Sequence, residues 1–348
     1  MSKLTATAIR WAERGMIPDT LIRAGIRALL RERLVELPLD SPEDIDATKQ
    51  SFVALMDESP VALVPDRANE QHYEVPAAFF AGVLGPRRKY SACHWVDQTG
   101  SLEQAEEDAI AATCRRTDLQ DGMRVLELGC GWGSVSLWAA ERYPRSEFLA
   151  VSNSRSQRAY IEAEAARRSL GNLRVITCDM NDFATEERFD RAISVEMFEH
   201  MRNHRKLFER IHGWLTPGGR FFMHIFCHRE VPYAFEDRGP GDWMTRHFFS
   251  GGLMPSDDLP LRFQDRLKLV DRWRWSGKDY ERTLNAWLAN MDRNRKTLFP
   301  LLERTYGTDA APVWWERWRI FFMASAELFG FDDGEQWWVS HYLFERPA

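Results

Sequence analysis

Along residues 120–230, short hydrophobic runs alternate with longer segments whose apolar positions follow a helical repeat. The runs at 125–128, 148–152, 174–178, 191–195 and 220–227 predict five strands. Helices are expected through about residue 142, near 155–169 and over 204–214, the last followed by a turn at 216–219. Because strands alternate with helices and the fifth run is apolar almost throughout, the pattern predicts an α/β fold with a mostly parallel, doubly wound sheet.

The flanking sequence adds helices and closing strands to this core. Residues 1–60 read as helices, 72–118 as loops and helices, 229–262 as a Pro- and Gly-rich lid, and 280–329 as helical, while 267–273 and 338–344 predict two more strands. The sheet should therefore have about seven strands. We expect an N-terminal helical region over 1–118, the core over 119–228, and the lid, helical insertions and closing strands over 229–348.

Composition and charge narrow the class of protein. The chain has 348 residues, a net charge of −6 and a pI near 5.9, so there is no overall basic field to attract nucleic acid. Five scattered cysteines without a C-x-x-C pair indicate reduced thiols and argue against a disulfide framework or a metal site. No run of about eighteen apolar residues and no secretory signal is present, so we expect a cytoplasmic protein.

The first 34 residues are more basic than the rest, and Arg23, Arg27 and Arg31 recur at helical spacing beside an apolar face. Such a helix can cap the domain with its basic side in water, or it can touch anionic lipid or a partner. We favour the capping interpretation, and we keep membrane contact and a homodimer as open alternatives.

A glycine-rich turn follows the first strand. Glu127 heads the motif, and Gly129, Gly131 and Gly133 allow a tight turn and close backbone approach to a ligand at a helix N-terminus. The spacing differs from the dinucleotide fingerprint G-x-G-x-x-G. It is similar to the turn of S-adenosylmethionine-dependent methyltransferases, whose cofactor has no phosphate.

The ends of the following strands offer further cofactor contacts. After the second strand, the amides of Asn153 and Gln157 can bind the ribose hydroxyls, although Asn153 can instead cap the next helix. After the third, Asp179 and Met180 can bond and cover the adenine, with helix capping as the alternative for Asp179. We also expect Tyr90, Ser91 and Val195 to contact the cofactor.

Several separated motifs occur in one order along the chain. They are QHYEVP at 71–76, KYSACHW at 89–95, EMFEHM at 196–201, HIFCH at 224–228, FFSGGLMP at 248–255 and AELFG at 326–330. With the glycine turn, they resemble the cyclopropane-fatty-acid-synthase-like methyltransferases, and more closely their coclaurine N-methyltransferase branch. The resemblance covers nearly the whole chain from about residue 10 and implies a Rossmann-like fold with S-adenosyl-L-methionine as cofactor.

The resemblance also separates two chemistries. Cyclopropane synthases share a bicarbonate site of Cys, Glu, His and Tyr, and the matching positions here are Ala92, Glu199, His224 and Tyr280. The synthases also tend to have Gly where this chain has Glu196. The missing Cys and the added carboxylate point away from cyclopropanation. In the N-methyltransferases, the two Glu and the His of E-M-F-E-H serve the amine, which implies catalytic roles for Glu196, Glu199 and His200.

The chemistry of amine methylation agrees with these residue types. A protonated amine must lose a proton before it can attack a methyl group, and a carboxylate or imidazole within reach can hold the ammonium and accept that proton. If the segment after the fourth strand begins as a helix, Glu196, Glu199 and His200 share one face. A satisfied polar turn under the cofactor is the structural alternative.

Side chains for the substrate pocket are harder to single out. We name Tyr73, His224, Tyr280, Trp315 and Phe322 as candidates, although each aromatic is also what a buried core would contain. The sequence thus predicts a methyltransferase acting on the nitrogen of a small, tetrahydroisoquinoline-like amine. A lipid-modifying enzyme acting on unsaturated acyl chains and a non-catalytic cofactor-binding subunit are the alternatives.

Overall fold

The computed structural model describes residues 3–63, 75–96, 99–237, 239 and 242–348. Its centre is a seven-stranded sheet in the order β3-β2-β1-β4-β5-β9-β8. The strands are β1 (Arg124–Leu128), β2 (Glu147–Ser152), β3 (Leu173–Thr177), β4 (Phe189–Val195), β5 (Leu215–His228), β8 (Lys268–Trp275) and β9 (Trp337–Glu345). β1 to β5 run parallel, and β9 and β8 close the sheet in antiparallel register. The prediction of a mostly parallel sheet of about seven strands is confirmed.

Helices cover the sheet, and all but the first of them connect parallel strands. They are α6 (Leu102–Arg116), α7 (Ser134–Arg142), α8 (Arg155–Arg167) and α9 (His204–Trp214). The turn expected at 216–219 lies inside β5, because this strand already pairs with β4 at Leu215 and resumes pairing at Arg220 after a register shift. β1 has four buried residues of five because helices lie on both faces of the parallel part.

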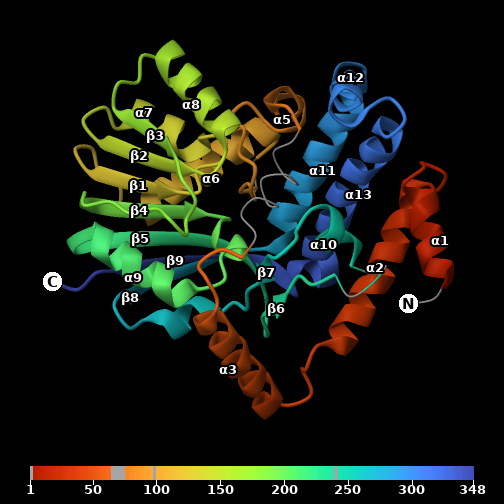
Figure 1. Cartoon of the computed structure of the whole chain (residues 1–348), viewed down its shortest axis with the longest axis horizontal. Helices are drawn as coiled ribbons and strands as arrows, with labels where there is room; N and C mark the ends of the chain where they lie inside the picture. The colour runs from red at the N-terminus through yellow and green to blue at the C-terminus, as the bar shows by residue number, and fades with distance from the viewer. Residues whose placement is uncertain (1–2, 64–74, 97–98, 238, 240–241) are drawn as a thin grey trace.

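A second group of helices lies beside the strand ends, on the right in Figure 1. It consists of α11 (Gly277–Arg293), α12 (Arg295–Tyr306), α13 (Ala311–Gly330), α5 (Ala77–Val83), α1 (Lys3–Ala12) and α2 (Asp19–Glu36), while α3 (Pro42–Glu58) crosses below. Aromatic side chains from α5, α11 and α13 form one large core cluster. These aromatic side chains therefore pack the helices against one another.

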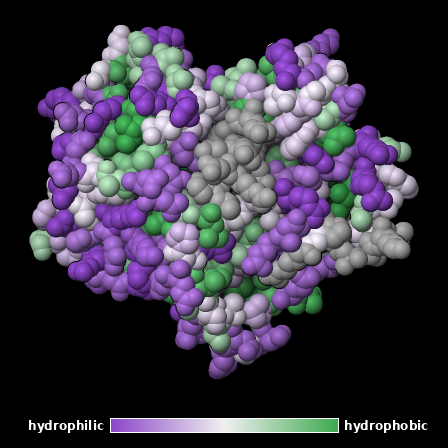
Figure 2. Space-filling model, in the orientation of Figure 1, coloured by the Kyte–Doolittle hydropathy of each residue, from purple (hydrophilic) through white to green (hydrophobic). Residues whose placement is uncertain are grey.

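The basic face of α2 is used within the molecule. Arg23 and Arg27 both pair with Glu327 of α13, at 2.9 Å and 2.6 Å, while Arg31 is exposed. Pairing within the chain agrees with the capping interpretation of this helix. Among the residues that the structure describes, no helix has the length and hydropathy needed to cross a bilayer. Figure 2 shows hydrophilic residues over most of one face, with hydrophobic residues scattered between them.

The described part of the region 229–262 forms short elements. They are β6 (Tyr233–Ala234), α10 (Trp243–His247), β7 (Leu253–Met254) and the 3-10 helix η2 (Leu259–Phe263). The N-terminal helices hold this region: Glu13 accepts a hydrogen bond from the Trp243 indole at 3.0 Å, and Arg33 pairs with Asp242 at 3.3 Å. Two of its residues, Ser250 and Gly251, reach the cavity described below.

Candidate active site

The turn between β1 and α7 needs its glycines. Gly129, Gly131 and Gly133 have φ values of 74°, 52° and 74°, a conformation that L side chains rarely adopt. A Cβ on Gly129 would lie 2.6 Å from Met197, and one on Gly133 would lie 2.8 Å from Ile161. A Cβ on Gly131 would meet nothing within 4 Å, and Gly131 lines the cavity. Gly129 and Gly133 therefore allow neighbouring side chains to pack closely against the turn, and Gly131 leaves the backbone open to a ligand.

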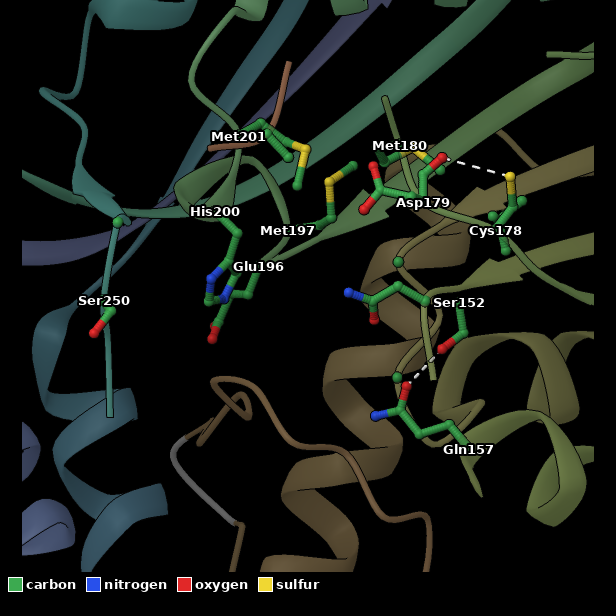
Figure 3. A pocket seen from close by; sticks show the side chains of 16 residues that line it. Ser152, Gln157, Cys178, Asp179, Met180, Glu196, Met197, His200, Met201 and Ser250 are labelled. Carbon is green, nitrogen blue, oxygen red and sulfur yellow. Dashed lines mark hydrogen bonds between the residues drawn. The ribbon is translucent and has the colours of Figure 1, made fainter. Parts of the chain in front are cut away.

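A cavity of about 810 Å³, its open mouth included, lies at the carboxyl ends of β1, β2, β3 and β4. Open α/β sheets bind their ligands at this edge. The lining residues are Ala62, Gly129, Gly131, Val151, Ser152, Asn153, Gln157, Cys178, Asp179, Met180, Glu196, Met197, His200, Met201, Ser250 and Gly251. Figure 3 shows Glu196 and His200 on one side of this space and Ser152 and Gln157 on the other.

The predicted ribose side of the cavity presents a buried amide. Gln157 is buried, and its Oε1 accepts a hydrogen bond from the Ser152 hydroxyl at 2.7 Å. Its Nε2 has no hydrogen-bond partner among the described residues. A buried donor at a cavity wall fits a ligand that brings an acceptor oxygen. Ser154, not Asn153, caps α8 through a hydrogen bond from the backbone N–H of Gln157, which leaves Asn153 in the cavity wall.

The predicted adenine side also lines the cavity. Asp179 and Met180 follow β3 directly, and Cys178 lies beside them (Figure 3). One carboxylate oxygen of Asp179 accepts a hydrogen bond from the backbone N–H of Asn181 at 2.6 Å, so part of its acceptor capacity serves the local turn. Contact of these residues with a cofactor stays a prediction.

Five residues predicted to bind the cofactor do not line this cavity. Glu127 lies below the glycine turn and accepts a hydrogen bond from the Ser136 hydroxyl of α7, and burial raises its pKa to about 7. The others are Tyr90 among the rings of Phe80 and Trp287, Ser91 bound to Lys89, Gly133 against Ile161, and Val195, the half-buried last residue of β4. Their positions support the walls around the cavity.

Glu196 is the centre of a buried hydrogen-bond network at the end of β4. Its Oε1 accepts from the Ala92 backbone N–H at 2.8 Å and from His224 Nε2 at 3.1 Å, and its Oε2 accepts from the Tyr280 hydroxyl at 2.6 Å. Burial by itself would raise the pKa of Glu196, but the hydrogen bonds from His224 and Tyr280 and the charge of Lys89 lower it. The cavity wall thus contains an ionised carboxylate.

The loop before α6 holds the backbone donor of this network. Lys89 is fully buried, and its ammonium nitrogen lies 2.6 Å from both the Ser91 hydroxyl and the Ala92 carbonyl. Burial lowers the pKa of Lys89, while the negative groups around it, Glu196 among them, act in the opposite direction. Lys89 therefore fixes the loop that aims the Ala92 N–H at Glu196.

The expected shared helical face of Glu196, Glu199 and His200 is not formed, so this prediction is wrong. Glu196 has φ 47°, and only Phe198–His200 form a short 3-10 turn. The left-handed backbone at Glu196 follows from the sheet, because its N–H still bonds the His224 carbonyl of β5 at 2.9 Å before the chain turns away. Glu196 and His200 nevertheless both line the cavity, whereas Glu199 does not.

Glu199 and His200 have different electrostatic environments. Burial and the nearby Glu196 raise the pKa of Glu199 well above its usual range, and its Oε1 accepts from the Phe226 N–H at 2.7 Å. Glu199 is thus a protonated acid under the site. Burial lowers the pKa of His200 to about 4, so its imidazole is neutral at physiological pH, and the ring stacks on Phe249 with centroids 4.6 Å apart.

The predicted substrate residues lie in several places. Tyr73 falls outside the described residues. His224 and Tyr280 both donate hydrogen bonds to Glu196. The resemblance to the cyclopropane synthases grouped them with Glu199 instead. Trp315 of α13 packs on the Phe299 ring of α12, and Phe322 packs on Trp287 and Trp318, so both belong to the aromatic core.

Sequence reasoning missed several members of the site. The backbone N–H of Ala92 and the buried Lys89 gave no chemical signal, because an alanine and a motif lysine do not reveal that they face a carboxylate. Ala62, Ser250 and Gly251 reach the cavity from distant segments. Met197 and Met201 belong to the motif at 196–201. Because this motif follows the fourth strand, the sequence could have predicted that both residues lie near the cavity.

Comparisons with known proteins match this architecture. The sequence model of the mycolic acid cyclopropane synthetase family matches residues 64–334. The (S)-coclaurine N-methyltransferases of Papaver somniferum and Thalictrum flavum subsp. glaucum are each 33% identical to this chain, over 341 and 338 residues. These matches cover 97% of both the chain and the P. somniferum enzyme, and 96% of the chain and 94% of the T. flavum enzyme. The cyclopropane-fatty-acyl-phospholipid synthase of Escherichia coli strain K12 is 29% identical over 220 residues, 63% of this chain and 54% of that enzyme.

Solved structures show the same relation. A coclaurine N-methyltransferase bound to N-methylheliamine and SAH superimposes with a TM-score of 0.94 at 33% identity, over 98% of this chain and 99% of that one. The mycolic acid cyclopropane synthase CmaA1, complexed with SAH and CTAB, gives a TM-score of 0.69 at 22% identity, over 82% of this chain and 99% of that one. At 22% identity, the likeness to CmaA1 shows the shared fold alone.

Proposed function

Because this chain belongs to the mycolic acid cyclopropane synthetase family of S-adenosylmethionine-dependent methyltransferases, we propose that it methylates the nitrogen of a small cyclic amine, of the tetrahydroisoquinoline class. The enzyme is an N-methyltransferase and uses S-adenosyl-L-methionine as methyl donor. The observation that carries the proposal is the ionised Glu196 beside a neutral His200 in the wall of the cavity. A cationic amine is the substrate that such a pair suits.

The residues at the strand ends fit the cofactor. The open side of Gly131 admits a ligand close to the backbone, and the unpaired Nε2 of Gln157 can donate to a ribose hydroxyl. Asp179 and Met180 line the same cavity, which supports their proposed roles in bonding and covering the adenine. When bound, S-adenosyl-L-methionine supplies an electrophilic methyl group on a sulfonium.

Glu196 can hold the amine as an ammonium. The two oxygens of a carboxylate offer about four acceptor sites in total. Three are taken by Ala92, His224 and Tyr280, which leaves one on Oε2 for a donor in the cavity. The three fixed donors also prevent the carboxylate from turning, so the substrate nitrogen would be held in one position. Alignment of this kind is a large part of what an enzyme contributes to a displacement reaction.

His200 is suited to take the proton. An ammonium has no lone pair for the attack on carbon, so one proton must leave the nitrogen first. The imidazole of His200 is neutral at physiological pH and lies in the same wall as Glu196. Glu199, protonated and bonded to the β5 backbone, would act by positioning the turn that carries His200.

Two aromatic rings support side chains of the site from behind. Phe249 stacks on His200, and Phe329 stacks on Tyr280 with centroids 4.3 Å apart. Neither Phe249 nor Phe329 lines the cavity, so these rings hold His200 and Tyr280 in place. A second copy of this chain or a membrane surface as partner stays a prediction.

A substrate panel tests the proposal. The full chain is incubated with S-adenosylmethionine labelled on the methyl carbon and with two panels, cyclic secondary and tertiary amines and vesicles of unsaturated phospholipids. We expect label in the amine panel, most with tetrahydroisoquinolines. Label confined to the lipid panel would overturn the proposal in favour of acyl-chain modification, and label in neither panel would also count against it.

A further inference from the structure

Arg202 lies two residues after His200, where the short turn that carries the imidazole ends. Its side chain is charged, yet only 6% of the residue is exposed. The guanidinium Nη2 donates a hydrogen bond to the carbonyl oxygen of Gly251 at 3.1 Å. Gly251 lines the cavity, so this bond joins the turn to a wall of the site. Because a buried charge is costly without a partner, the fold favours the arrangement in which the two groups stay together.

The Gly251 carbonyl lies at the end of a small hairpin in the lid segment 229–262. β6 and β7 form this hairpin, and the N–H of Phe235 continues their pairing to the carbonyl of Gly252 at 3.0 Å. Burial lowers the pKa of Arg202, and the charge of Glu236, the residue after Phe235, raises it. Arg202 therefore interacts with both sides of the hairpin, through a hydrogen bond on one side and through charge on the other.

The same end of the hairpin holds the ring that stacks on His200. Phe249 lies on the imidazole with centroids 4.6 Å apart. The lid backbone lies directly on the turn here, because a Cβ on Gly252 would come within 2.2 Å of the Phe249 ring and 3.2 Å of the Glu199 carbonyl oxygen. Figure 3 shows Ser250 of this segment on the same side of the cavity as His200. The position of residues 249–252 therefore decides how His200 is packed.

The backbone of Arg202 is fixed by a different segment, the one that follows α3. Its N–H donates to the Val61 carbonyl at 2.6 Å. The neighbouring Met201 forms an isolated β-bridge with Ala62, and both residues line the cavity. Arg202 is thus anchored through its backbone on one cover of the cavity, while its side chain binds the other.

We propose that Arg202 is a positioning residue for amine methylation, which holds the lid at Gly251 over the turn that carries His200. The bond keeps the amine side of the cavity closed and keeps Phe249 on the imidazole before the substrate arrives. The amine then meets a preformed wall, so its binding free energy is not used to close the lid. This inference rests on the proposed function, in which His200 takes the proton of the amine.

Variants at Arg202 separate the hydrogen bond from the bulk of the side chain. Arg202→Met removes the charge and the donor but keeps an aliphatic stem, and Arg202→Lys keeps a charged donor for the Gly251 carbonyl. Arg205→Met is the control, because this arginine pairs with Asp57 of α3, 3.0 Å away, and with Asp265, outside the lid. Calorimetric titration with S-adenosylhomocysteine shows whether each variant is folded, and we expect affinities close to that of the wild type.

The kinetic readout is KM for an accepted amine at saturating S-adenosylmethionine, measured beside kcat. A hydrogen bond from a charged donor corresponds to a change of about tenfold or more in an equilibrium constant. In Arg202→Met we expect KM to rise about tenfold, because the apparent affinity falls with the population of the closed lid, whereas kcat should fall less. Arg202→Lys should recover most of this loss. A KM that stays at the wild-type value in Arg202→Met, or equal impairment of the Met and Lys variants, would overturn the proposal.

A second variant acts on the same segment without changing the guanidinium. Gly252→Ala introduces a Cβ that displaces the Phe249 ring, so it should also raise KM for the amine more than it lowers kcat. It keeps the proposal testable if Arg202→Met does not fold. An unchanged KM in a folded Gly252→Ala variant would count against the claim that this end of the lid shapes the amine side.

A further readout does not need turnover. Hydrogen-exchange mass spectrometry of the full chain without amine should show residues 249–254 exchanging on the order of tenfold faster in Arg202→Met than in the wild type. Arg202→Lys and Arg205→Met should exchange at close to the wild-type rate. Unchanged exchange in Arg202→Met would contradict the proposal even if no amine were ever methylated. Faster exchange in a protein that methylates no amine would support the hold on the lid and refute the proposed function alone.

Discussion

Replacement of Glu196 by glutamine removes the negative charge of the site with very little change of shape. The amide oxygen can take the place of Oε1, which accepts from Ala92 and His224, and the amide nitrogen can donate to the Tyr280 hydroxyl in place of Oε2. The bonds from Ala92 and His224 are then kept, and the third is reversed, with the Tyr280 oxygen as acceptor. The free energy of unfolding should therefore fall by no more than about 1 kcal/mol. Glu196→Ala, in contrast, would leave three buried groups unpaired, at about 1–3 kcal/mol each.

The kinetic effect should be much larger than the effect on stability. A hydrogen bond to a charged group contributes about 1.5–3 kcal/mol, so the amine should bind about tenfold to about 150-fold more weakly to Glu196→Gln. Turnover should fall as well, because the substrate nitrogen is no longer held in one position beside His200. The affinity for S-adenosylmethionine should stay close to that of the wild type.

Steady-state kinetics with an accepted amine at saturating S-adenosylmethionine measures KM and kcat separately, and calorimetry measures the cofactor affinity. Glu187→Gln is the matched control. It removes a carboxylate that pairs with Arg124, at the beginning of β1 and thus at the opposite end of the strands from the cavity. If Glu196→Gln keeps full activity, the proposed mechanism is wrong.

Three further predictions concern the cofactor turn, the base and the lid. Gly131→Val strains the left-handed backbone at φ 52° and should lower the free energy of unfolding, but its side chain meets open space, so the variant should still fold; calorimetry should detect no S-adenosylmethionine binding, and normal affinity would refute the assigned turn. His200→Ala should lower kcat by about a hundred- to ten-thousandfold, more than it raises KM. Higher pH should partly restore its rate because more amine arrives deprotonated, and a rate that does not rise with pH would argue against a role as base. Cofactor product and amine together should protect the segment 229–262 from proteolysis, and equal cleavage with and without them would argue against a lid.

Much of the fold could be predicted from the sequence because its signals are local. The strands of the core are short apolar runs between polar segments, and the turn at 129–133 requires glycine at each left-handed position. The carboxyl ends of parallel strands meet at one edge of the sheet. Strand order alone therefore predicts that Asn153, Asp179 and Glu196 lie near a common cavity.

The detailed arrangement around Glu196 could not be predicted in the same way. Its donors come from a loop, from β5 and from α11, segments far apart in the sequence. Helical spacing suggested a shared face with Glu199 and His200, but the backbone N–H of Glu196 bonds to β5 and the residue adopts a left-handed conformation. Pairing in the sheet therefore overrode the local helical pattern. Trp315 and Phe322 were ambiguous because a helix core and an aromatic pocket use the same residue types.

The central claim is that the methyl group goes intact to a nitrogen, and one measurement tests it directly. The wild-type enzyme is supplied with S-adenosylmethionine carrying a trideuterated methyl group, and the product is analysed by mass spectrometry and NMR. N-methylation predicts an amine that carries the whole trideuteromethyl group on its nitrogen. A product in which the transferred carbon has lost a deuteron, bridging a former double bond of an acyl chain, would contradict the account.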